Sequence, residues 1–279
     1  MDRGTKCQQS WRESRRRRRV AAMVRIAVMG LGEAGALYAR GLADAGAEVT
    51  GYDPHVDVSA LGIAQRQTLA DCLEGAELVL SLVGARASVD AARDAVERMA
   101  PGALLADLNT AAPATKREVA ALARGAGMAV ADVAVLAPVP RAGHRTPLLA
   151  SGDAAEEFAR RMRPLGVPVD VAPGGIGDAA RLKLLRAVFM KGLAALVIEG
   201  LEAARATGAE EWLRAQIAAE LGADGDTAVE RLVAGTYMHV ERREHELRDV
   251  LSVLDEAGTP ADMTRATHAW LARILAESR

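Results

Sequence analysis

Six residues near the start of the sequence, Gly30-Leu31-Gly32-Glu33-Ala34-Gly35, have the spacing of a phosphate-binding glycine loop. They follow the short apolar run 24–29 and open a stretch of helical pattern. In such a loop the first glycine permits a tight turn, the second lets the backbone approach a pyrophosphate, and the third lets the helix pack against the strand. The first turn of a helix also offers free N–H groups to an anion. We therefore expect these six residues to bind a dinucleotide, and a plain glycine-rich turn is the alternative.

An acidic residue stands where such a loop requires a partner. Asp53 closes the expected strand Glu48–Tyr52 and follows Gly35 by 18 residues. A carboxylate at this place accepts hydrogen bonds from the hydroxyl groups of the adenosine ribose. A phosphate on the same ribose would meet a like charge. The sequence therefore predicts NAD as the preferred cofactor and NADP as the second choice.

The lysines of this chain are few, which makes their positions informative. The sequence has 31 arginines but four lysines, and two of these, Lys183 and Lys191, fall in one expected helix. Arginine does not release its proton near neutral pH, whereas a partly buried lysine can. We therefore expect Lys183, early in the helix and beside the cleft between two domains, to act as a general acid/base. The alternative is a lysine that extends along a helix face, and for Lys191 a structural role or a substrate contact is expected.

Apolar runs alternate with amphipathic stretches as far as residue 171, a rhythm that predicts strand–helix–strand units and a parallel sheet. After the breaker residues 173–177 the pattern is helical, with Asp178 as the expected N-cap of a long helix. The fold class is therefore α/β, with a Rossmann-type parallel sheet domain followed by an all-helical domain, joined by a long interdomain helix. The expected strands are 24–29, Glu48–Tyr52, 78–82, 104–108 and 128–133, and the expected helices are 34–45, 87–100, 113–126, 178–207, 210–221, 226–257 and 261–277.

This pattern predicts a dinucleotide-binding domain at 23–172 and a helical domain for substrate binding and dimerisation at 173–279. Residues 1–22 hold eight basic and two acidic residues. We expect them to be a disordered extension, with a nuclear signal, a nucleic-acid arm and an export signal as alternatives. Four large side chains are expected in the core of the helical domain, namely Phe189, Met190, Trp212 and Trp270.

Composition excludes several classes of protein. The net charge is −2, and because the basic extension contributes +6, the remaining body carries −8 and does not resemble a nucleic-acid binder. Two cysteines, Cys7 and Cys72, are too few for a disulfide framework, which favours the cytoplasm. No uninterrupted apolar run has the length of a membrane span. Glu241 and His245 have the spacing of a ligand pair but lack a third ligand, so no metal is expected.

Residues 24–276 resemble the β-hydroxyacid dehydrogenase superfamily, which includes 3-hydroxyisobutyrate and 6-phosphogluconate dehydrogenases. The resemblance lies closest to an uncharacterised branch of that superfamily. It is carried by four segments, VMGLGEAG at 28–35, DLNTAAPATK at 107–116, DVAVLAPVPRAGHRTPLLASG at 132–152 and GDAARLKLLRAVFMKG at 177–192.

The resemblance implies an NAD(P)-dependent oxidoreductase that transfers hydride between the nicotinamide and an alcohol or hydroxyacid-type small molecule. Lys183 falls at the lysine that acts as acid/base in the family. The cofactor site is expected to continue over Leu82, Val83, Asn109 and Thr110. A homodimer formed through the helical domain is implied as well.

The substrate half of the pattern departs from the family. Leu136-Ala137-Pro138 stands where better-known branches have a Ser-Gly-Gly turn that holds a substrate carboxylate, and the asparagine that accompanies the family lysine is missing. A simple small β-hydroxyacid is therefore not the expected substrate. The residues expected to contact the substrate instead are Arg141, His144, Arg186, Lys191 and His245.

Two other functions fit parts of the sequence. Imine reductases share this architecture, but they commonly replace the helix lysine, whereas this chain keeps Lys183. A non-catalytic dinucleotide-binding protein would need only the glycine loop and Asp53. A lysine retained in a lysine-poor chain favours the dehydrogenase.

Overall fold

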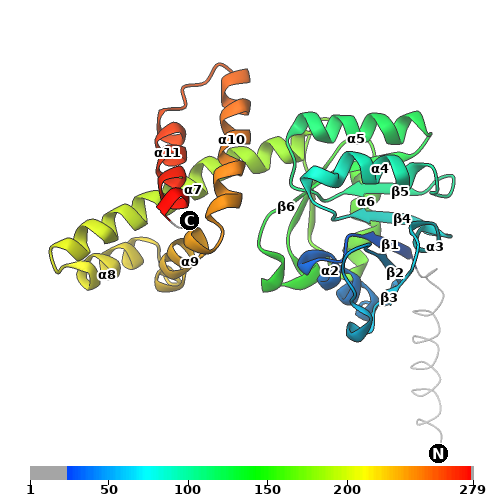
Figure 1. Cartoon of the computed structure of the whole chain (residues 1–279), viewed down its shortest axis with the longest axis horizontal. Helices are drawn as coiled ribbons and strands as arrows, with labels where there is room; N and C mark the ends of the chain where they lie inside the picture. The colour runs from blue at the N-terminus through cyan, green and yellow to red at the C-terminus, as the bar shows by residue number, and fades with distance from the viewer. Residues whose placement is uncertain (1–23, 278–279) are drawn as a thin grey trace, which may run out of the picture. The chain divides into compact units, whose positions relative to one another are not determined.

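The computed structural model describes residues 24–277, so the expected extension 1–22 lies outside the described residues. The chain divides into two compact units, of which the first ends at Ala180 and the second is Arg181–Arg279. The first unit combines strands with helices, and the second contains helices alone among its described residues (Figure 1).

The first unit is built on one sheet, which has eight strands within residues 24–277 in the order β3-β2-β1-β4-β5-β6-β7-β8. Neighbouring strands are parallel except for β6 and β7, which are antiparallel. The Rossmann-type α/β class is thus confirmed, with one antiparallel addition near an edge. The strands are β1 Arg25–Met29, β2 Glu48–Tyr52, β3 Ala64–Gln65, β4 Leu78–Ser81, β5 Leu104–Asp107, β6 Ala129–Val135, β7 Leu148–Ser151 and β8 Val169–Val171.

Both faces of the sheet are covered, because its central strands are apolar on both sides. Ile26 and Val28 pack into a cluster with α2 (Glu33–Asp44) and α6 (Ala155–Met162). Ala27 and Met29 point to the other face, where the cluster includes α3 (Leu69–Leu73), α4 (Ser88–Val96) and α5 (Pro113–Gly125). Strands buried on both faces are the usual state of parallel sheets.

The second unit contains most of α7 (Asp178–Ala206), α8 (Glu210–Glu220), α9 (Gly225–Met238), α10 (Val240–Glu256) and α11 (Asp262–Glu277). The prediction of one long helix at 226–257 is wrong, because α9 and α10 occupy this range. The helix breaks at His239, whose φ of −125° and ψ of 28° depart from helical values. Just before the break, the hydroxyl of Thr236 donates to the Leu232 carbonyl. Such a side-chain bond competes with the backbone hydrogen bonds of the helix and often bends it.

Two of the four large side chains expected in the helical core are exposed. Phe189 and Trp212 are 65% and 66% exposed, whereas Trp270 is buried beside Leu271 and Ile274. Helical spacing shows which residues share a face of a helix, but not whether another element covers that face. No helix among residues 24–277 is long and apolar enough to cross a membrane.

Candidate functional site

Most of the cofactor residues expected from sequence are gathered at one edge of the sheet. Parallel strands bring their carboxyl ends together at one edge of the sheet. The strand order reverses at β1, which pairs with β2 on one side and with β4 on the other. Ligands of such sheets bind at this reversal. Gly30 follows β1, Asp53 follows β2, Leu82 and Val83 follow β4, and Asn109 and Thr110 follow β5 by two and three residues.

The three glycines of the loop are required for different reasons. Gly30 has a φ of +87°, and a Cβ there would lie 2.5 Å from the Leu82 carbonyl oxygen. A Cβ on Gly35 would overlap the carbonyl of Gly30. At Gly32 a Cβ would meet nothing within 4 Å, and its φ of −59° suits any residue. The fold therefore needs the first and third glycines, while the backbone at the second faces open space where a ligand can approach it.

The helix behind the loop offers donors to an anion. Gly32 is the N-cap of α2, and no side chain caps this end. The amides of the first helical turn, which includes Glu33 and Ala34, have no carbonyl acceptor within a helix. Together with the positive end of the helix dipole they form a phosphate site. The space at Gly32 and these donors fit the pyrophosphate of a dinucleotide.

Asp53 is joined to the glycine loop. Its Oδ2 accepts a hydrogen bond of 2.8 Å from the Leu31 amide, and its Oδ1 accepts bonds from the amides of His55 and Val56 at 2.8 and 3.1 Å. These donors orient the carboxylate at the end of β2. Each carboxylate oxygen has further lone pairs, so Asp53 can still accept bonds from ribose hydroxyls.

A row of polar side chains beneath this edge was missed by the sequence prediction. Ser81, Asp107, Asp132 and Ser151 are aligned across four neighbouring strands, and each is 2% exposed or less. Lys116 of α5 lies between the two carboxylates, with its Nζ 3.2 Å from Asp107 Oδ2 and 3.4 Å from Asp132 Oδ1. The scarcity of lysine in this chain was a signal that pointed to Lys116 as well.

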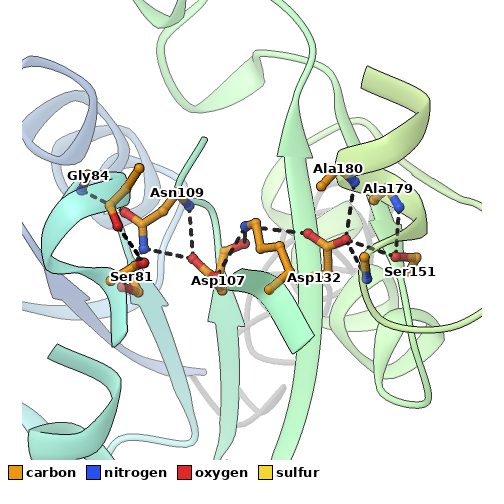
Figure 2. Close-up of polar contacts among 12 residues, drawn as sticks. Ser81, Gly84, Asp107, Asn109, Asp132, Ser151, Ala179 and Ala180 are labelled. Atoms are coloured by element: carbon orange, nitrogen blue, oxygen red, sulfur yellow. Dashed lines mark hydrogen bonds and ion pairs between the residues drawn. The ribbon is translucent and has the colours of Figure 1, made fainter. Parts of the chain in front are cut away.

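Asn109 connects this row to the loop after β4. Its Nδ2 donates to Ser81 Oγ at 2.9 Å and to Asp107 Oδ1 at 2.7 Å, and its Oδ1 accepts from the Gly84 amide at 2.7 Å (Figure 2). Asn109 is buried, whereas Thr110 beside it is exposed. Asn109 thus supports the edge of the sheet from the buried side, and Thr110 is accessible at the surface of this edge.

Two expected substrate residues of the first unit lie in the connection from β6 to β7. Arg141 is exposed, and His144 packs against Gly41 of α2, where a Cβ would overlap its ring. Burial and the neighbouring charge of Arg145 lower the pKa of His144. A largely neutral imidazole packed on a helix is a weak site for an anion.

The remaining expected residues belong to the second unit. Arg186 is exposed. Lys191 Nζ forms an ion pair of 2.5 Å with Glu246 Oε2 of α10. Burial raises the pKa of Glu246, but the charge and hydrogen bond of Lys191, together with the charges of Lys183 and Arg242, outweigh burial and hold this pKa below its usual value. Lys183 and Lys191 therefore share the field of one carboxylate.

His245, the last of these candidates, is directed to its own helix. Its Nδ1 lies 2.8 Å from the Glu241 carbonyl oxygen, and the side chain is 46% exposed. His245 lies in α10, six residues after the break in the predicted helix at His239. Within residues 24–277 no group of three or more His, Cys, Asp or Glu side chains is arranged to hold a metal ion.

Comparison with known proteins agrees with the geometry of the sheet edge. Residues 25–165 match the family described as the NAD-binding domain of 6-phosphogluconate dehydrogenase. The NAD-dependent L-serine dehydrogenase of Pseudomonas aeruginosa is 30% identical over 213 residues, which are 71% of this chain and 69% of that enzyme. The chain belongs to the β-hydroxyacid dehydrogenase superfamily. It is accordingly an NAD(P)-dependent dehydrogenase, as the sequence predicted.

Residues 204–274 match a second family, which is described as a domain of unknown function. Solved structures extend the likeness of fold over both units. The 3-hydroxyisobutyrate dehydrogenase of Mycobacterium tuberculosis, solved with L-serine, has a TM-score of 0.77 at 21% identity and covers 91% of this chain and 94% of its own. An imine reductase of Myxococcus stipitatus has a TM-score of 0.63 at 19% identity, with 91% and 94% covered. At these identities the likeness concerns the fold alone.

The different demands on the glycines can be tested by valine substitution. Gly32→Val should fold normally but lose NAD affinity by about 100-fold or more, because its side chain enters the space where the backbone must approach the pyrophosphate. Gly35→Val should instead lower the melting temperature, because its side chain overlaps the Gly30 carbonyl. Calorimetric titration with NAD and thermal unfolding separate the two effects. Full NAD affinity in the Gly32 variant would contradict the assignment of this loop.

Asp53 should determine the choice between NAD and NADP. Asp53→Ala removes the carboxylate that meets the 2′-phosphate, so NAD should bind more weakly and NADP more tightly. The ratio of the two dissociation constants should move by about tenfold or more. Because Asp53 also holds the Leu31 amide, Asp53→Asn is the control that keeps an acceptor without the charge. Wild-type protein that binds NADP tenfold tighter than NAD would overturn the preference.

Proposed function

We propose that this enzyme oxidises an alcohol or hydroxyacid-type small molecule, with Lys183 as the general acid/base. The observation that supports the role of Lys183 is its place on α7, three residues after Ala180. The first turn of this helix is fixed to the sheet, because the amides of Gly177 and Ala180 donate to Asp132 Oδ2 at 3.1 Å each. A proton-transfer group requires such a defined position.

The chemistry divides between cofactor and protein. A bound oxidised nicotinamide would supply the acceptor for the hydride that leaves the carbon bearing the hydroxyl group. The neutral amine of Lys183 takes the hydroxyl proton as the C–O double bond forms, and returns it in the reverse reaction. Glu246 stands near both lysines and stabilises their charged forms. Lys191 already pairs with Glu246 at 2.5 Å. The positive charge of Lys191 therefore offsets part of the stabilisation that Glu246 gives to a charged Lys183.

The substrate end favours a compound other than a small β-hydroxyacid held by a glycine turn. The Leu136 amide donates to the Pro147 carbonyl at 3.0 Å and is therefore already engaged. Pro138 has no N–H to donate. A carboxylate would find few backbone donors in this segment, so we infer a substrate whose recognition depends on other contacts. L-serine and 3-hydroxyisobutyrate, which the relatives' names give, are small β-hydroxyacids and serve as the reference compounds that a better substrate should exceed.

Reduction of cyclic imines is the second candidate, and the fold shared with imine reductases favours its inclusion in a screen. A panel of hydroxyacids, simple alcohols and cyclic imines, followed by nicotinamide absorbance, separates the two reactions. Oxidation of a hydroxyl compound with NAD supports the proposal, and turnover of imines alone would replace it. Tight NAD binding without turnover of any compound would favour the non-catalytic alternative.

We also propose that two copies of the chain associate through the helical unit. Leu185, Phe189 and Leu196 lie on one face of α7 and are 37%, 65% and 60% exposed. Spacings of four and seven residues place them in one stripe along the helix. An apolar stripe of this kind on a long helix is typical of an interface, and the resemblance to dimeric dehydrogenases makes a second copy the expected partner.

Substitutions of Lys183 test the proposed chemistry. Lys183→Ala should lower turnover by about 10²- to 10⁴-fold while NAD affinity changes little, because proton transfer is lost and the nucleotide site is untouched. Lys183→Arg should lower turnover almost as much, since arginine keeps the charge but does not exchange the proton. Steady-state kinetics with the best compound of the screen and NAD titration are the measurements. An arginine variant with most of the wild-type turnover would refute the role of Lys183.

The proposed association can be measured by sedimentation at micromolar concentration. Wild-type protein should sediment as a dimer, and Phe189→Glu should shift it toward the monomer, because a charge would be buried in the interface. Met263→Glu, at another exposed apolar residue of the same unit, serves as the control for surface charge. A wild-type monomer under these conditions would exclude the dimer.

A further inference from the structure

Lys116, Asp107 and Asp132 form a buried ion group, although charged side chains are usually exposed to water. The Lys116 side chain is 1% exposed, and the carboxylates of Asp107 and Asp132 are 2% and 0% exposed. Lys116 Nζ also donates to the Asp107 carbonyl oxygen at 2.7 Å. Removing three charges from water is costly, and apolar side chains of similar volume often serve stability as well or better. A role in positioning other groups is therefore a better reason for this arrangement than stability alone.

On one side the group determines the orientation of Asn109. Asp107 Oδ1 accepts from both the amide and Nδ2 of Asn109, at 3.0 and 2.7 Å. With Nδ2 fixed in this way, Asn109 Oδ1 faces the Gly84 amide. The loop after β4, whose first residues are Leu82 and Val83, is thus tied to the buried charges (Figure 2).

On the other side the group holds the beginning of α7. Asp132 Oδ2 accepts from the amides of Gly177 and Ala180, and Ser151 Oγ accepts from the Ala179 amide at 2.9 Å and lies 3.2 Å from Asp132 Oδ2. The sequence predicted Asp178 as the N-cap, but Asp178 lies inside the helix and its Oδ2 accepts from the Gly175 amide. A carboxylate from a distant strand thus takes the place of the expected local cap.

We propose that Lys116 is a positioning residue that couples the cofactor loop after β4 to the first turn of α7. The Lys116 ammonium holds two like charges on adjacent strands at fixed positions. Without it, Asp107 and Asp132 would repel each other, and either Asn109 or the α7 amides would lose a fixed acceptor. Both the nucleotide edge and the helix that carries Lys183 then depend on one cation. This inference rests on NAD binding at the glycine edge, but its test requires no turnover.

Hydrogen exchange of the whole protein, measured with and without NAD, tests the coupling. In the wild type, bound NAD should slow exchange of the amides at 177–180 by about tenfold, because an ordered loop after β4 stabilises the far end of the same group. Exchange at 177–180 that is unchanged by saturating NAD would overturn the proposal. This measurement does not depend on any variant.

Variants identify Lys116 as the connecting residue. Lys116→Met leaves two carboxylates facing each other and is expected to destabilise the protein. Lys116→Met/Asp107→Asn restores the net charge of the group and leaves Asn109 and the α7 amides their own acceptors, while the connection is cut. The double variant should fold, bind NAD about tenfold more weakly and lose the NAD-dependent protection at 177–180. If it folds and retains both wild-type affinity and protection, Lys116 is structural and the proposal is wrong.

Arg124→Met is the matched control. Arg124 lies on the same helix and pairs with Asp153 at 2.8 Å, but both side chains are largely exposed. Its loss should change neither NAD affinity nor exchange at 177–180 by more than about twofold. The outcome is independent of the proposed chemistry. If Lys183→Arg kept full turnover, the acid/base role would fail while the coupling through Lys116 could still be observed.

Discussion

The buried ammonium of Lys116 between two carboxylates imposes a requirement on everything around it. The free energy that burial of these charges costs is recovered only when the ion pairs and their hydrogen bonds are all formed. Lys116 comes from α5, Asp107 and Asp132 from adjacent strands, and further donors from the start of α7. These four segments must therefore be in place together. The region that presents the cofactor loop is consequently built as one unit rather than as separate turns.

The sheet determines where the chemistry is placed. Because β1, β2, β4 and β5 are parallel neighbours, the residues that follow them lie at one edge whatever their distance in sequence. Gly32 provides open space at this edge and Asp53 provides an oriented carboxylate. In the polar row below, Ser81, Asp107 and Asp132 each follow by two residues an apolar residue of the sheet face that α4 and α5 cover. Gly32 and Asp53 are the features that the sequence predicted for a dinucleotide site.

The residues that were expected to bind the substrate are largely engaged elsewhere in the fold. The segment after β6 offers few free donors, since the Leu136 amide bonds to Pro147. Lys191 is paired with Glu246, and His144 is packed against α2. Each of these residues looked available in the sequence and is engaged within its own unit.

The sequence by itself determined the features that arise from neighbouring residues. Glycine spacing, apolar runs and helical periodicity are local, so the loop at 30–35, Asp53, the major strands and the long helix after 177 were predicted within a few residues. Strands β3 and β8 were not predicted, because two or three residues carry no measurable period. Strand β7 was missed because no α-helix separates it from β6, so it falls outside the strand–helix–strand rhythm. Whether Phe189 or Trp212 is covered, and where a helix of mixed pattern breaks, depends on packing from elsewhere. The Lys116 group was decided by tertiary structure alone, since its partners stand 9 and 16 residues away and a buried charge is stable only once they have met.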